Sequence, residues 1–187
     1  MSKESFIVGF FIGIVLTGVV AYAALPMLES EETHEETGRI LQMKYEEFRS
    51  TAFLMDSSTS NWTRIPDTEM NITTEGDSRL SVTFSAIGIL HLDTTFTGNC
   101  KFNISLHIGG ITSRQTRVSL YRGGSGATLE MSKTIYVHLE TDTLPKGAYQ
   151  ISVNWIAQHD GIGSNQLILA NTPFNFTRSL SVWEIST

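Results

Sequence analysis

The residues that could bind a metal or carry out redox chemistry are few in this 187-residue chain, and they are widely spaced. The five histidines show none of the short spacings typical of zinc sites: His34, His91, His107, His138 and His159. Two of them, His107 and His138, could share a metal only if their strands were neighbours. The single cysteine, Cys100, has no second cysteine for an internal disulfide, and we expect it to be a small buried apolar residue. We therefore predict no metal site.

The acidic and nucleophilic residues do not form a recognisable catalytic pattern either. Glu140 and Asp142 flank a threonine near a predicted strand end, which favours a solvated edge over an acid–base pair. No G-x-S-x-G motif occurs. The loop QHDGIGSN, which contains His159 and Asp160, could offer oxygen ligands to calcium but lacks EF-hand spacing. We predict that the chain is not an enzyme and needs no cofactor.

Four asparagines match the N-x-[ST] glycosylation motif: Asn61, Asn71, Asn103 and Asn175. All four follow the apolar segment described below, on the side that export would expose to a glycosylation machinery. We predict that they are glycan acceptors, with chance matches as the alternative.

The first 28 residues form the most apolar part of the chain. Residues 6–25, FIVGFFIGIVLTGVVAYAAL, contain no charge, and about 20 helical residues suffice to cross the ~30 Å hydrocarbon core of a bilayer. Ala21-Tyr22-Ala23 fits a signal-peptidase site, so a cleaved leader is the alternative to a retained anchor. We favour the anchor because its apolar core exceeds the ~7–15 residues of a leader.

The charges beside this segment predict its orientation. Lys3 precedes it and the acidic residues 29–36 follow it, so we expect a cytoplasmic N-terminus in the cell membrane and an extracellular C-terminal part. Gly9 and Gly13 form a G-x-x-x-G face that could pack against another membrane helix. Glycine is also common in such helices without that role.

Residues 29–57 predict an acidic linker and a short helical stalk. Thr33 and Glu36 have capping-box spacing. Apolar residues then recur at intervals of four and three, as in a heptad seam: Leu41, Tyr45, Phe48, Ala52 and Met55. This stripe could join helices in an oligomer, or it could pack onto the chain's own domain.

Residues 58–187 change to short alternating runs separated by turn residues, the pattern of half-buried strands. The predicted core-facing residues are Leu80, Val82, Phe84 and Ala86; Phe102, Ile104, Leu106 and Ile108; Ile135, Val137 and Leu139; Tyr149, Ile151, Val153 and Trp155; and Leu180 and Val182. Asn103, Ser105 and His107 would then face solvent. Gly109-Gly110 suits a two-residue hairpin. About eight strands predict an antiparallel sandwich or jelly roll.

The strand SVTFSA, the hairpin HIGG, the run LPKGAYQISVNWIAQ and the last strand RSLSVWEI occur in an order that resembles the jelly-roll domains of the C1q and tumour-necrosis-factor superfamily. The resemblance covers residues 58–187. It implies a jelly-roll head, often trimeric and carried on a stalk or a single membrane helix. It supplies no receptor-contact or metal motif.

Together these features predict a membrane-anchored, glycosylated surface protein that displays a β-sandwich as a structural or interaction module. The net charge of −6 and the lack of a basic cluster exclude nucleic acid as an expected partner. We expect residues 6–25 to contact membrane lipid, and we expect further copies of the chain, with a trimer favoured, or other membrane subunits as partners. Candidate binding aromatics are Tyr121, Tyr136 and Trp183. The alternatives are a pilin- or archaellin-like filament subunit and a carbohydrate-binding module.

Overall fold

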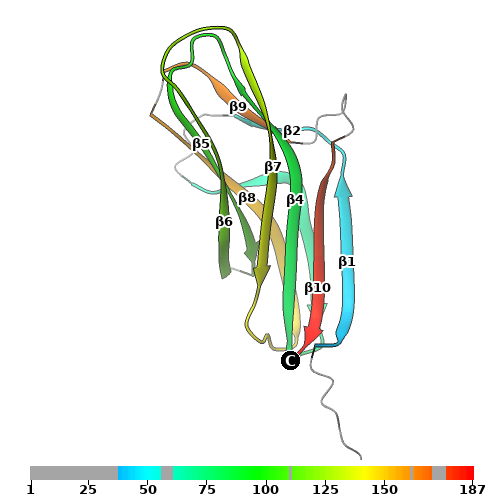
Figure 1. The fold of residues 1–187 in the computed structure, drawn as a ribbon. Coiled ribbons are helices and arrows are strands. Elements are labelled where there is room, and N and C mark those ends of the chain that lie inside the picture. Colours follow the sequence, from blue (N-terminus) through cyan, green and yellow to red (C-terminus); the bar gives the residue numbers. More distant parts are fainter. Residues whose placement is uncertain (1–37, 56–60, 110, 161, 170–175) are drawn as a thin grey trace, which may run out of the picture. The chain divides into compact units, whose positions relative to one another are not determined.

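The described part of the chain is an antiparallel β-sandwich of ten strands (Figure 1). The computed structural model describes residues 38–55, 61–109, 111–160, 162–169 and 176–187. Within these ranges no helix is long and apolar enough to cross a membrane. The predicted anchor at residues 6–25, with Gly9 and Gly13, lies outside them, as does Asn175.

The larger sheet is built around the long strand β4. Its strands are β1 (Ile40–Phe48), β2 (Ala52–Met55), β4 (Ser78–Leu92), β7 (Leu129–Glu140), β9 (Asn165–Leu169) and β10 (Arg178–Ser186). β7 pairs along one side of β4, while β10 and β9 pair with successive parts of its other side. β1 then adds to β10, and β2 adds to β9. β1 is therefore an edge strand of this sheet.

The smaller sheet has the order β3-β8-β5-β6. Its strands are β3 (Thr63–Thr74), β5 (Gly98–Ile108), β6 (Ile111–Arg122) and β8 (Gly147–His159). Ile108 pairs with Ile111 across the β5–β6 hairpin, and Gly109 has a φ of +52°. The predicted hairpin between these strands is confirmed, and Gly110 of its turn lies outside the described residues.

The core lies between the two sheets and follows the predicted period of two. Leu80, Val82 and Phe84 of β4 are fully buried, and they face a buried row on β5 that includes Phe102, Ile104 and Leu106. Because each strand places alternate side chains on one face, the apolar residues of both sheets meet in one cluster. The mainly-β sandwich prediction is confirmed in this respect.

The short helical stalk predicted within residues 29–57 is wrong for its described part, because residues 40–48 and 52–55 are strands. The apolar spacing of four and three also fits strands in which some of these residues face solvent. Leu41 and Tyr45 point outward from β1, whereas Phe48 and Ala52 are buried in the sandwich. The compact unit starts at Thr37, ahead of the predicted boundary at residue 58. Met55 ends β2.

The predicted exposure of the outer face of β5 is also wrong at two positions. Asn103 is 5% exposed, and Ser105 is fully buried. Asn103 lies between Arg117 of β6 and Ile156 of β8, and Arg117 Nε donates a hydrogen bond to Asn103 Oδ1 at 2.8 Å. Side chains of the neighbouring strands therefore cover the middle of this face.

Asp93 fastens two loops at one end of the sandwich. Its carboxylate accepts hydrogen bonds from the backbone N–H and the hydroxyl of both Thr95 and Ser164. These bonds, chiefly those from the side chains of Ser164 and Thr95, hold the pKa of Asp93 well below its usual range. The loop after β4 and the loop before β9 are thus held together.

Candidate interaction face

Edge strand β1 carries its apolar residues on the side that faces solvent. Met43 lies opposite Trp183 and Tyr45 opposite Ser181, on the outer face of the larger sheet. Met43 is 54% exposed and Tyr45 is 56% exposed. The polar residues alternate with them and point toward the smaller sheet. This is the reverse of the usual arrangement in a half-buried strand, where the apolar side faces the core.

These side chains form the largest local group of exposed apolar residues on a strand of the described chain. Of the nine large hydrophobic residues that are exposed, β1 contributes four: Ile40, Leu41, Met43 and Tyr45. The half-buried Trp183 and Ile185 of β10 extend the group, because they stand opposite Met43 and Ile40. We call this set of six residues the β1 face. Clustered exposed apolar side chains mark interaction sites more often than single ones do.

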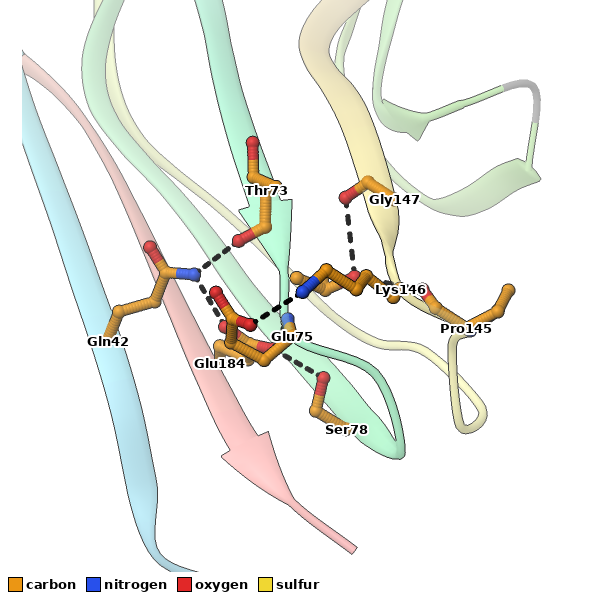
Figure 2. A network of polar contacts seen from close by, with 9 residues as sticks. Gln42, Thr73, Glu75, Ser78, Pro145, Lys146, Gly147 and Glu184 are labelled. Carbon is orange, nitrogen blue, oxygen red and sulfur yellow. Dashed lines mark hydrogen bonds and ion pairs between the residues drawn. The ribbon is translucent and has the colours of Figure 1, made fainter.

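The polar side of β1 ties the strand to the smaller sheet. Lys44 Nζ donates to the carbonyl of Asn71 at 2.6 Å. Gln42 Nε2 donates to the carbonyl of Thr73 at 2.5 Å, as Figure 2 shows. Both acceptors belong to β3, the edge strand of the smaller sheet. The inward side chains of β1 therefore occupy backbone acceptors of β3 and fix the strand's orientation.

A buried carboxylate lies at the centre of this attachment (Figure 2). Glu184 of β10 is fully buried and accepts hydrogen bonds from Gln42 Nε2 at 2.5 Å, Ser78 Oγ at 2.6 Å and the Glu75 N–H at 3.0 Å. Burial alone would raise the pKa of Glu184, but the hydrogen bonds from Ser78, Gln42 and Glu75 outweigh it, so the pKa is lowered. The charged form thus joins β1, β10 and the β3–β4 turn.

A buried arginine holds the other end of β1. Arg178 is fully buried and donates to the carbonyl and the hydroxyl of Ser50, at 3.0 and 2.9 Å, and to the carbonyl of Pro66 at 3.0 Å. Its guanidinium lies 5.8 Å from the centre of the Phe48 ring, a cation–π geometry. Burial lowers the pKa of Arg178, and the charge of Asp67 opposes that shift. This contact fixes the corner between β1 and β2.

The other edges near β1 are less open to pairing. β3 contains a register shift between Arg64 and Glu69, with Pro66 and a positive-φ Asp67 inside it. β2 has four residues. Bulges, prolines and short strands all hinder edge-to-edge pairing. The one register shift between β1 and β10 lies near the start of β1, between Ile40 and Gln42, and from Gln42 to Phe48 the register is continuous.

The three candidate aromatics do not form one site. Trp183 belongs to the β1 face, and Tyr136 of β7 lies on the same outer surface of the larger sheet, opposite Ser85 rather than near Met43. Tyr121 is on β6, in the smaller sheet. The sequence predicted Trp183 as a binding aromatic, and it predicted Leu41 and Tyr45 as oligomer contacts of a helix that is a strand instead. The alternation of Leu41, Met43 and Tyr45 with polar residues could have indicated Met43 as well.

The histidines and the candidate carboxylates are spread over the surface. His107 is in the smaller sheet and its ring contacts Trp62, with the ring centres 5.8 Å apart; burial lowers its pKa. His138 is on β7 of the larger sheet, where its Nδ1 lies 3.0 Å from Thr83 Oγ1. The two strands do not pair. Glu140 contacts Arg79 at 3.7 Å and is half exposed.

In the loop QHDGIGSN, which was considered as a calcium site, the carboxylate of Asp160 binds another residue of the sandwich. Asp160 accepts hydrogen bonds from Asn99, at 2.7 Å from the backbone N–H and 2.8 Å from the side-chain amide. These bonds, the side-chain one first, lower the pKa of Asp160. Among the described residues, no group of three or more metal-binding side chains converges.

The fold and the open edge define an antiparallel β-sandwich with an exposed apolar edge strand. No family model matches the chain, and no curated protein matches it. Among solved structures, it is similar to dimeric latent PorU from Porphyromonas gingivalis at 13% identity, over 78% of this chain and 13% of that chain, with a TM-score of 0.37. The subviral particle of VP2 from infectious bursal disease virus gives 9% identity, 81% and 39% coverage, and a TM-score of 0.38.

A likeness to a tumour-necrosis-factor protein also occurs. Eiger from S. frugiperda matches at 9% identity, over 73% of this chain and 91% of that chain, with a TM-score of 0.29. The chain spans 13% of the PorU chain and 39% of the VP2 chain. These distant likenesses concern the β-fold and carry no argument about function.

Proposed function

We propose that this chain is a membrane-anchored, glycosylated surface protein whose β-sandwich serves as an interaction module through the β1 face. The observation that carries the interaction role is the inverted strand β1, with Met43 and Tyr45 more than half exposed beside Trp183. Burying these side chains against a partner would release about 25 cal/mol for each Å² of apolar surface removed from water.

The surface location rests on the sequence. The uncharged segment 6–25 is long enough to cross a bilayer, and the acidic residues after it favour export of the sandwich. Asn61 and Asn71 are exposed on the sandwich, so both could carry glycans in the folded protein. Asn103 could not without breaking its contact with Arg117.

The test is isolation of the protein from its native membranes, followed by mass analysis of the intact chain and its peptides. We expect the protein to resist extraction at alkaline pH, to begin at Met1 or Ser2, and to carry glycan mass at Asn61 or Asn71 but not at Asn103. A soluble cytosolic protein with an intact start and no sugar would contradict the proposal.

The start of the mature chain separates the alternatives. A start near Phe6 would favour a filament subunit, and a start at Ala24 would indicate a secreted sandwich. Glycan binding that is lost on replacing either Tyr121 or Tyr136, both exposed, would instead favour a carbohydrate-binding module.

A further inference from the structure

We propose that β1 pairs with β1 of a second copy of this chain, antiparallel and about a two-fold axis at Tyr45, so that the two larger sheets become one. This inference rests on the proposed role of the β1 face and names its partner. The interface would be isologous, because each copy contributes the same strand to it.

The first reason is the free edge of β1. Among the described residues the strand pairs only with β10, so its other side presents unpaired backbone N–H and C=O groups. An extended edge of this kind is a template for adding a strand from another chain. From Gln42 to Phe48 the register with β10 has no bulge, so nothing in this stretch bends the edge away.

The second reason is the alternation of faces, which limits the possible registers. In a continuous antiparallel sheet, residues directly opposite each other lie on the same face. The outward Met43 and Tyr45 must therefore face outward residues of the partner strand. The two-fold axis must then pass through a residue pair such as 43–43, 44–44, 45–45 or 46–46, not between residues.

The third reason is charge complementarity, which distinguishes one of these possible axis positions from the others. An axis at Tyr45 sets Lys44 of each copy opposite Glu46 of the other, giving two opposite-charge pairs. Glu46 is exposed and forms no hydrogen bond or ion pair with any residue that the structure describes. Lys44 uses one of the three donors of its ammonium on Asn71. Both groups thus retain the capacity to pair across the interface.

The neighbouring registers lack this match. An axis at residue 44 sets Lys44 against its own copy, and an axis at residue 46 does the same for Glu46; like charges directly opposite are destabilising. An axis at Met43 aligns Gln42 with Lys44 and forms no opposite-charge pair within Ile40–Phe48. Charged residues on an edge strand usually prevent it from pairing with another chain. In β1 the charges instead favour one register of pairing with a second copy.

The pairing also extends the β1 face. The outward side chains of both copies would lie on one side of the joined sheet, with Tyr45 beside its symmetry mate and Trp183 flanking it in each copy. These side chains would contact one another along the joined sheet, while the outer face of that sheet stays open to water.

Cysteine cross-linking of the full-length protein, in membranes or detergent, tests the register. The one native cysteine, Cys100, is buried, so an introduced cysteine is the accessible thiol. Under mild oxidation Tyr45→Cys should give a disulfide-linked dimer, because directly opposite residues have Cα atoms about 4.5–5.5 Å apart, within disulfide range. Met43→Cys is the matched control, with nearly the same exposure on the same face.

In the proposed register the two copies of residue 43 are offset by four residues, or about 13 Å. We expect about tenfold more cross-linked dimer from Tyr45→Cys than from Met43→Cys, because a disulfide cannot span that distance. A second variant, Met43→Cys with Glu47→Cys, should cross-link because those positions face each other. Equal cross-linking of the two single variants, or none from Tyr45→Cys and the double variant, would overturn the inference.

The outcome is independent of the proposed location. A membrane-bound, glycosylated protein without these cross-links would keep its proposed function and lose the second copy as partner. A soluble, unglycosylated protein that still forms the Tyr45→Cys cross-link would lose its proposed function and keep the second copy as partner.

Discussion

Gln42 on β1 stands directly opposite Glu184 on β10, and its side-chain amide donates to the buried carboxylate at 2.5 Å. This contact joins the edge strand to the body of the sandwich. Together with the bonds from Ser78 and the Glu75 N–H, it makes Glu184 the polar anchor of the end at which β1 begins. The β1 face is presented in a fixed orientation because this anchor and Arg178 hold the two ends of the strand.

Replacing Glu184 with glutamine should destabilise the sandwich by about 1–3 kcal/mol, because an amide N–H₂ would replace one acceptor oxygen among three donors. Denaturant unfolding of the purified protein measures the loss. Asp142→Asn, in the exposed β7–β8 connection, is the control and should change the free energy of unfolding by less than about 0.5 kcal/mol. Equal stability of the two variants would show that the carboxylate contributes nothing to the fold.

The same residue predicts a pH dependence. The folded state lowers the pKa of Glu184 below its ordinary value of 4.5, so its contribution is present above pH 4.5 and is lost as the pH falls through the lower folded pKa. Thermal unfolding from pH 7 to pH 3 should therefore show a steeper acid loss for the wild type than for Glu184→Gln. Parallel curves would contradict this, because Asp93 and Asp160 titrate alike in both proteins.

Arg178→Met should cost about 1–3 kcal/mol, because it removes the three hydrogen bonds that the buried guanidinium donates to Ser50 and Pro66. The loss would loosen the corner between β1 and β2. Arg49→Met is the matched control, since the Arg49 side chain is 80% exposed and its surface ion pair contributes little. Unfolding midpoints compare the two, and a similar small change in both would contradict the role given to Arg178.

Gly163→Ala should destabilise the loop held by Asp93. Gly163 has a φ of +97°, and an added Cβ would lie 2.7 Å from both the backbone N and Cα of Phe96. We expect a loss of about 1–3 kcal/mol from the backbone strain. Gly124→Ala, where a Cβ meets no atom within 4 Å, should be nearly neutral. The prediction fails if the two alanine variants unfold at the same temperature.

The strands of the core were predictable from sequence because their signal is local. Leu80, Val82 and Phe84 alternate with small polar residues. A period of two of this kind indicates a strand with one buried face. β1 was not predicted because its apolar residues also fit a heptad. What decides between helix and strand is pairing with β10, whose partner residues lie 130 or more positions away, as Gln42 and Glu184 do.

The burial of Asn103 and the partners of Arg178 and Glu184 could not be predicted from the local sequence for the same reason. The covering of Asn103 depends on Arg117 and Ile156 from two neighbouring strands. The period of two that places Leu180 and Val182 on the core face also places Arg178 and Glu184 there, but it does not show what these charges bind. Their hydrogen-bond partners come from distant strands and turns, so only the assembled sandwich reveals them.

Charge-reversed copies of β1 test the central claim most directly. Lys44→Glu and Glu46→Lys each set like charges across the proposed two-fold axis, whereas a mixture of the two restores both opposite-charge pairs. With different tags on full-length proteins, each variant should fail to capture itself and the two should capture each other. Self-capture of either variant as strong as wild type, or no capture in the mixture, would contradict pairing through β1.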